Sequence, residues 1–140
     1  MPVTLAEPRI QRFLATKDVV VLATLQGDGA PLAMPMWFLH DGEAIAMISV
    51  ADTQKVRNLR RDGRVCVVAE SVSASGAICG VTVQGRAEFL DDGPERRALA
   101  ARLLAKYDPR LERLWSGREM PPNRVMFRIV PERVRDWGLT

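Results

Sequence analysis

Apolar runs of strand length, separated by tight-turn signals, fill the first part of this chain. Val19–Leu25 is continuously apolar and ends at Gln26–Gly27–Asp28–Gly29, a strong signal for a β-hairpin. A second strand is expected over Ala30–His40, and the turn Asp41–Gly42–Glu43 leads it into a third over Ala44–Ser49. Hairpin turns between successive strands favour antiparallel pairing.

The rest of the chain adds more strands and only a few helices. The further strands are expected at Val65–Glu70, at Ile78–Leu90, and over Arg124–Val130 and Arg133–Trp137, which form one strand or two. Ile78–Leu90 alternates apolar and polar side chains with a period of two. Helical patterns occupy Pro8–Thr16, a basic segment after Ser49, a stretch from Pro94 to about Tyr107 that buries Leu99 and Leu103, and a short turn at Leu111–Trp115.

This arrangement predicts a mainly β fold, with six or seven antiparallel strands closed into a barrel and peripheral helices that cap it. A doubly wound α/β sheet is disfavoured because the helices do not alternate with the strands. The 140 residues are the size of one domain with one core. Several strands are apolar on both faces, which predicts that one outer face is buried against another subunit.

Composition and charge narrow the function classes. The chain is 47% hydrophobic and 26% charged, as in an ordinary globular protein. Its formal net charge of +3 suits binding of an anionic small molecule and is too small by itself to indicate binding of nucleic acid. Its apolar runs are too short to span a membrane. Met1–Glu7 lacks the pattern of a signal peptide, so a cytoplasmic location is expected. Cys66 and Cys79 have no metal-binding spacing and are expected to be reduced, buried thiols.

The basic segment after Ser49 carries the clearest candidate binding residue. It opens with hydroxyls and Lys55, although the positive end of a helix dipole favours acidic residues or a bound phosphate. Between Asp52 and Arg64 there are five basic and two acidic residues, a local excess equal to the net charge of the whole chain. Lys55 is therefore a candidate phosphate ligand, and an ordinary solvated helix is the alternative interpretation.

The second strand contains two prolines four residues apart, Pro31 and Pro35. Proline cannot donate to a β-ladder, so this strand is expected at an edge or a bulge, where backbone groups are free to meet a ligand. Met34, Met36 and Trp37 beside them could form a wall for an aromatic ring system. The alternative is an edge strand that packs on a partner subunit through Trp37.

Conventional catalytic machinery is scarce. The one histidine, His40, lies at a strand end, where a surface role is the simpler interpretation. The sequence has no metal-ligand cluster and no Gly-x-Gly-x-x-Gly motif. If the protein is an enzyme, a cofactor must supply the reactivity while the chain binds and orients it. No catalytic residue and no metal ligand is therefore assigned.

Taken in order, these segments resemble the pyridoxamine 5′-phosphate oxidase-like split β-barrel flavoproteins. The resemblance covers nearly the whole chain and rests on the order and spacing of four segments: Met34–Pro35–Met36–Trp37–Phe38, Thr53–Arg61 with Lys55 and Asn58, Val83–Gln84–Gly85–Arg86–Ala87, and Val134–Arg135–Asp136–Trp137. It implies a single antiparallel split β-barrel over residues 1–140 that binds a flavin or deazaflavin.

The resemblance also implies a homodimer with two cofactor sites at the subunit interface. It places the cofactor phosphate at the start of the basic helix, at Ser49, Thr53 and Lys55, with Arg57 as an addition. It places the tricyclic ring against Met34, Pro35, Met36 and Trp37.

Within this family, the Pro–Met–Trp–Phe strand and the Thr-x-Lys-x-x-Asn-Leu-Arg-Arg helix look most like the branch that uses the deazaflavin coenzyme F420. FMN carries a single phosphate too and is the alternative cofactor. The expected function is hydride transfer between F420 and an unidentified small organic substrate, with the protein supplying orientation and excluding water. The substrate is expected to enter under the Ser71–Gly76 loop or the Leu111–Gly117 turn.

Two other functions stay open from the sequence. A non-catalytic module that carries flavin or haem would bind a cofactor without turnover. A nucleic-acid-binding barrel would use the basic helix, but the chain lacks the exposed aromatic platform that such barrels normally use, so no nucleic-acid partner is expected.

Overall fold

The computed structural model describes residues 2–139. Its elements are α1 (Pro8–Ala15), β1 (Val20–Leu25), β2 (Pro31–Met36), β3 (Leu39–Asp41), β4 (Ala44–Val50), α2 (Gln54–Arg61), β5 (Arg64–Val72), β6 (Ile78–Leu90), α3 (Pro94–Lys106), α4 (Arg110–Trp115) and β7 (Arg124–Trp137). The chain is therefore mainly β, as predicted. None of the helices in the described part is both long and apolar enough to cross a membrane.

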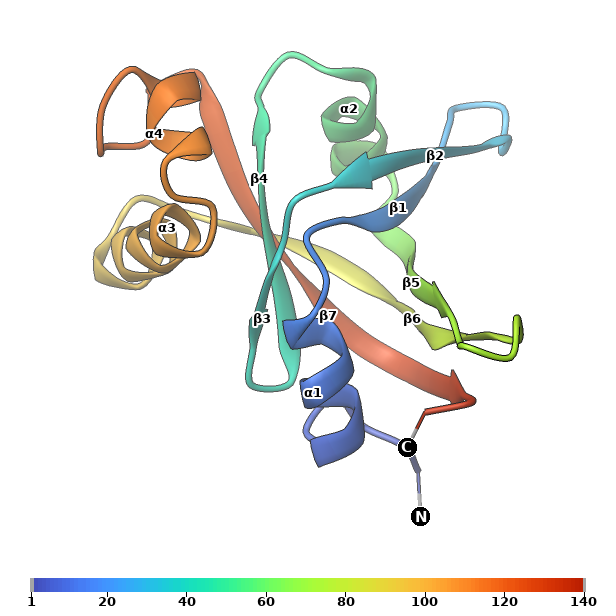
Figure 1. Cartoon of the computed structure of the whole chain (residues 1–140). Coiled ribbons are helices and arrows are strands. Elements are labelled where there is room, and N and C mark those ends of the chain that lie inside the picture. Colours follow the sequence, from blue (N-terminus) through green and yellow to red (C-terminus); the bar gives the residue numbers. More distant parts are fainter. Residues whose placement is uncertain (1, 140) are drawn as a thin grey trace.

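The seven strands form one antiparallel sheet in the order β2–β1–β5–β6–β7–β4–β3. β2 and β3 are its two edges, yet only Trp37 and Phe38 separate them in the sequence. A connection of this length spans at most about 11 Å from Met36 to Leu39. The sheet must therefore curl until its edges approach each other, as Figure 1 shows. This curled sheet confirms the predicted split barrel.

The structure divides one predicted strand into two and joins the last two predicted segments into one. The single strand expected over Ala30–His40 is wrong, because the chain leaves one edge of the sheet at Met36 and joins the other at Leu39. The last two segments, in contrast, form one strand, β7. Its register with β6 shifts at Gln84 and Gly85, next to Pro131. Since proline has no N–H to donate, it is tolerated at such an irregularity.

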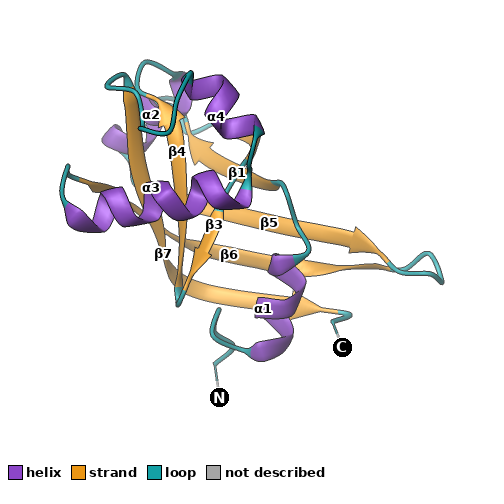
Figure 2. Ribbon diagram, turned by 60° about the vertical axis from the view of Figure 1, so that its left-hand side comes forward, coloured by secondary structure: helices purple, strands orange, loops and turns teal. Residues whose placement is uncertain are grey.

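The core has two parts, one on each face of the sheet. The interior of the curl is filled by buried aliphatic and aromatic side chains that include Leu22, Val67, Val83, Phe127 and Ile129. The second part lies under α3 and α4 and contains Leu99, Leu103, Tyr107, Trp115 and Met126. Figure 2 shows α3 lying across β3, β4 and β7. The predicted burial of Leu99, Leu103 and Tyr107 is confirmed.

The outer face of β1 and β5 is apolar and only partly covered. Val21 pairs with Val68 and Ala23 pairs with Cys66, so these four half-buried side chains share one face. The predicted burial of such a face by a second subunit stays a prediction. Cys66 and Cys79 are both free, but they are half-buried rather than buried as expected.

Candidate cofactor site

The corner between β4 and α2 brings two hydroxyl groups together at the start of the basic helix. Ser49 is 5% exposed and donates to the carbonyl of Val50 (3.1 Å), and Thr53 donates to the same carbonyl (3.2 Å). The two hydroxyl oxygens are 3.5 Å apart. α2 has no acidic residue in its first turn, and Thr53 makes no side-chain cap. Its first amide groups are therefore not satisfied by a capping side chain, which suits an anion.

Lys55 is a half-buried cation without a counter-ion. Burial lowers the pKa of its ammonium group, and no neighbouring carboxylate opposes this shift. It takes part in none of the ion pairs formed within residues 2–139. Arg57, two residues farther along α2, is different: its exposed guanidinium is paired with Asp52 at 2.7 Å and bonded to Gln54 at 3.3 Å. Of these two cations, Lys55 is the one free to bind an anion.

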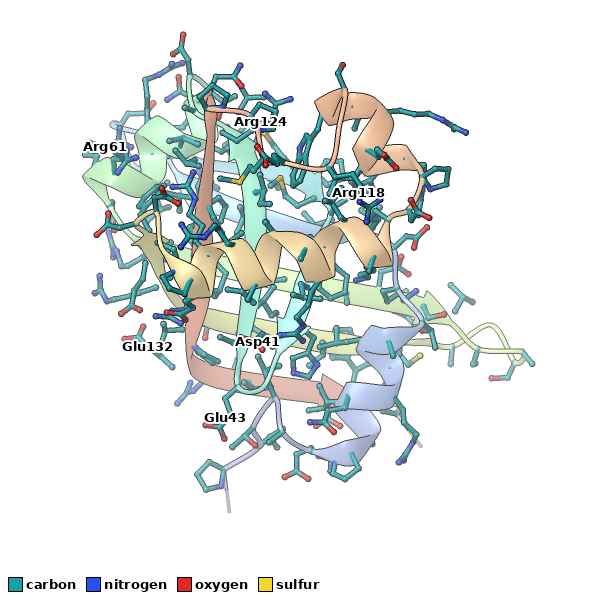
Figure 3. The ribbon with its side chains drawn as sticks, turned by 90° about the vertical axis from the view of Figure 1, so that its left-hand side faces the viewer. Asp41, Glu43, Arg61, Arg118, Arg124 and Glu132 are labelled. Carbon is teal, nitrogen blue, oxygen red and sulfur yellow. The ribbon has the colours of Figure 1, made fainter. Side chains whose placement is uncertain are left out.

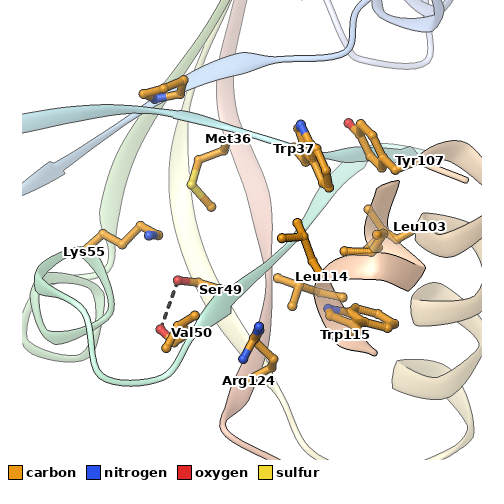
Figure 4. A pocket seen from close by; sticks show the side chains of 13 residues that line it. Met36, Trp37, Ser49, Val50, Lys55, Leu103, Tyr107, Leu114, Trp115 and Arg124 are labelled. Atoms are coloured by element: carbon orange, nitrogen blue, oxygen red, sulfur yellow. Dashed lines mark hydrogen bonds between the residues drawn. The ribbon is translucent and has the colours of Figure 1, made fainter. Parts of the chain in front are cut away.

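A cavity of about 420 Å³ connects this corner to an aromatic wall. Figure 4 shows Lys55 and Ser49 at one end and Trp37, Tyr107, Leu114 and Trp115 at the other, with Met36 above the middle. The remaining lining residues are Pro35, Ile48, Val50, Leu103, Leu111 and Arg124. The cavity therefore has a polar, cationic end and a flat apolar end, the two environments that a phosphate and a ring system require.

β2 supplies one wall of the cavity and lies at an edge of the sheet, as its prolines predicted. Pro31 and Pro35 are exposed and lie opposite Leu25 and Val21 of β1, and Pro35 borders the cavity. Beyond Met36, the Trp37 ring stacks on Tyr107 with 4.6 Å between centroids and an angle of 8°. This parallel stack fixes the plane of the Trp37 wall.

The fully buried Tyr107 also holds the backbone of the link between β2 and β3. Its hydroxyl accepts the Phe38 N–H at 2.8 Å and lies 2.8 Å from the carbonyl of Asp18 and 3.0 Å from that of Phe38. Burial raises the pKa of Tyr107 to about 12, so the hydroxyl stays protonated and remains a donor. Tyr107 thus binds both the side chain and the backbone of the segment that walls the cavity.

Lys106 gives this region a pH-dependent stability. Its ammonium donates to the carbonyl of Phe38 (2.7 Å) and lies 3.5 Å from the Phe38 ring centroid. Burial lowers the pKa of Lys106 to about 8, although Asp18 opposes the shift. In the unfolded chain this pKa returns towards 10.5, so the unfolded state binds more protons between these values. The contribution of Lys106 to folding stability should therefore rise as the pH increases from about 8 to 10.5.

The measurement is urea unfolding of wild type and Lys106→Met across this pH range. As the pH rises, the free energy of unfolding of wild type should increase relative to that of the variant. A difference that stays constant with pH would show that the Lys106 ammonium is as well solvated in the folded protein as in the unfolded chain.

The structure brings most of the sequence-predicted site residues together. Pro35, Met36, Trp37, Ser49 and Lys55 all line the cavity. Thr53 adjoins it through the hydroxyl of Ser49. Met34 and Arg57 are not among the lining residues. Two routes were expected for substrate. The Leu111–Gly117 segment contains most of α4 and borders the cavity, whereas the Ser71–Gly76 loop is at the tip of the β5–β6 hairpin and does not line it (Figure 1).

Sequence reasoning missed the other walls. Tyr107, Leu114 and Trp115 come from the end of α3 and from α4, and Arg124 comes from the start of β7. Figure 3 shows Arg124 at the same end of the sheet as α2 and α4. The helical periodicity around Tyr107 indicated burial rather than a role in a site. The Leu111–Gly117 turn, which contains Leu114 and Trp115, was expected only as a route for substrate.

Acid–base and metal groups do not converge on the cavity. His40 does not line it, and its Nε2 lies 2.8 Å from the carbonyl of Gly42 in the following turn. Within residues 2–139, no group of three His, Cys, Asp or Glu side chains is arranged to hold a metal ion. The arrangement is suited to binding and orienting a ligand.

A protein-family comparison shows the family to which the chain belongs. The family model described as "Pyridoxamine 5'-phosphate oxidase" matches residues 6–138, which is nearly the whole chain. The chain belongs to this family. A search of curated proteins finds no match to this chain.

Solved structures support the same assignment. The conserved hypothetical protein Rv2991 from Mycobacterium tuberculosis is 26% identical with a TM-score of 0.80, covering 97% of this chain and 86% of that one. A putative pyridoxamine 5′-phosphate oxidase from Listeria innocua is 29% identical with a TM-score of 0.73, covering 92% and 95%. A heme-binding protein from Mycobacterium smegmatis is 26% identical with a TM-score of 0.79, covering 99% of this chain but 55% of that one.

Proposed function

We propose that this member of the pyridoxamine 5′-phosphate oxidase family is an oxidoreductase that uses the deazaflavin coenzyme F420. The observation that carries the proposal is the cavity that joins the unpaired Lys55 to the flat wall of Trp37. When bound, the cofactor supplies hydride transfer to or from a small organic substrate. FMN is the alternative cofactor, because it needs the same two environments.

The residues at the α2 end fit a phosphate group. Lys55 offers a partly desolvated ammonium. The hydroxyls of Ser49 and Thr53 both donate to the Val50 carbonyl, and either could turn its single O–H to a phosphate oxygen instead. A charge-assisted bond from Lys55 to the phosphate would replace the missing counter-ion. A contact between Arg57 and the phosphate stays a prediction from the sequence, because Arg57 would have to leave its ion pair with Asp52 to bind the ligand.

The residues at the other end fit a planar ring. Trp37, held parallel to Tyr107, presents a wall, and Pro35 and Met36 continue it along β2. We expect these residues to hold the ring at a fixed orientation while the apolar side chains of α4 exclude water from it. Met34 remains a predicted contact farther along the same strand. This scheme requires no proton transfer by a side chain of the cavity.

The proposal is tested by titrating the apoprotein with F420 and, separately, with FMN while following cofactor fluorescence. We expect F420 to bind at micromolar strength or better, and reduced F420 to be oxidised when a suitable electron acceptor is added. Binding of neither cofactor would overturn the proposal. Binding without turnover, with haem bound as well, would instead support a carrier role, for which the heme-binding structural neighbour is the precedent.

We also propose that the cofactor site is completed in a homodimer, in which the apolar face of Val21, Ala23, Cys66 and Val68 is covered. Sedimentation should give twice the mass of one chain. Val68→Asp should shift the protein to the monomer and weaken cofactor binding, because a charge would be buried in the interface. A wild-type protein that sediments as a single chain at high concentration would contradict the dimer.

A further inference from the structure

A second cation, Arg124, lies across the β4–α2 corner from Lys55. Arg124 begins β7 and is the register partner of Val50, the last residue of β4. The backbone hydrogen bond from Ala51 to the Asn123 carbonyl (2.8 Å) fixes this end of β7 against the corner. In Figure 4, Ser49 and Val50 lie between Lys55 and Arg124. The two cations therefore approach one region of the cavity from different elements.

Neither cation has a carboxylate partner in the described part of the chain, residues 2–139. The cavity lining contains Lys55 and Arg124 but no aspartate or glutamate. The side-chain hydrogen bond of Arg124 goes to a neutral group, the amide oxygen of Asn123 at 2.6 Å. Within residues 2–139, nine of the other sixteen arginines form ion pairs with carboxylates. Two like charges at a half-enclosed site raise its positive potential, which a bound anion would neutralise.

We propose that Arg124 is a second anion-binding residue of this cavity and that the ligand carries two negative charges at this end. The inference rests on the proposed function and adds to it the charge of the ligand. Two ligand chemistries meet the requirement. A phosphate monoester carries nearly two charges at neutral pH. A phosphodiester followed by a carboxylate carries one charge on each group.

The test compares riboflavin with FMN, which differ by the phosphate group, and adds F420, whose ring and tail also differ. Wild type, Arg124→Met and the control Arg113→Met are titrated with riboflavin, FMN and F420. Arg113 is exposed on α4 and is not a lining residue of the cavity. We expect Arg124→Met to weaken FMN or F420 by about tenfold or more and to change riboflavin by less than about twofold. This loss should shrink at high salt. An effect on FMN identifies the monoester, and an effect on F420 alone identifies the diester with a carboxylate.

Equal affinities in Arg124→Met and Arg113→Met, or a loss for riboflavin as large as that for FMN, would overturn the inference. If wild type binds neither F420 nor FMN, the proposed function fails, and binding of pyrophosphate is measured instead by calorimetry. Pyrophosphate binding that is lost in Arg124→Met would still support the two-cation site. Pyrophosphate binding that is absent from wild type, or unchanged in the variant, would overturn it.

Discussion

Lys55→Met should weaken binding of F420 or FMN by about 10- to 150-fold, equivalent to ~1.5–3 kcal/mol. The substitution keeps the length and the apolar stem of the side chain and removes only the ammonium. Because Lys55 is half-buried without a counter-ion, its charge is available to the ligand phosphate and is poorly screened by solvent. Fluorescence titration of both proteins measures the change directly.

Lys17→Met is the matched control. Lys17 lies 5.3 Å from the ring centroid of Phe13 at the end of α1 and is not a lining residue of the cavity, so its loss should leave cofactor affinity unchanged. Riboflavin, which has no phosphate, should bind equally to wild type and Lys55→Met. If Lys55→Met binds FMN and F420 as tightly as wild type does, the phosphate is bound elsewhere.

Tyr107→Phe should lower the free energy of unfolding by about 1–3 kcal/mol. The side chain is fully buried. Its hydroxyl accepts a hydrogen bond from the N–H of Phe38 and lies within donating distance of the carbonyls of Phe38 and Asp18. Removing it leaves these backbone groups without their partner in a place that water does not reach, while the ring stack with Trp37 remains possible. Urea unfolding followed by far-UV circular dichroism measures the loss.

Ser75→Ala removes an exposed hydroxyl in the β5–β6 hairpin and serves as the comparison, with an expected change within about 0.5 kcal/mol. Tyr107→Phe should also weaken cofactor binding, since the link that carries Trp37 loses its anchor. A Tyr107→Phe protein as stable as Ser75→Ala would mean that the hydroxyl does not hold the β2–β3 link.

The strands were readable from the sequence because apolar runs, period-two alternation and hairpin turns are local signals. Ile78–Leu90 was predicted with the boundaries that β6 has. The break at Trp37–Phe38 was not predicted, because it follows from the sheet closing on itself. No local signal reports that the two ends of one apolar run belong to opposite edges of a sheet.

The candidate site was predictable where it depends on the local sequence. A lysine among hydroxyls at a helix start is an anomaly in any context, and so are two prolines in one strand. The sequence favoured Lys55 and kept Arg57 as an addition. It could not show that Arg57 is paired with Asp52, because that pairing depends on the shape of the turn before α2. Arg124 and Tyr107 reach the cavity only through tertiary packing.

The most direct test of the whole account is a crystal structure of the protein with F420 or FMN bound. We expect the cofactor phosphate to lie within hydrogen-bond distance, about 2.7–3.2 Å, of Lys55 Nζ and close to the hydroxyl of Ser49. We also expect the ring to lie against Pro35, Met36 and Trp37. A cofactor bound with its phosphate away from Lys55, or with its ring outside this cavity, would contradict the account.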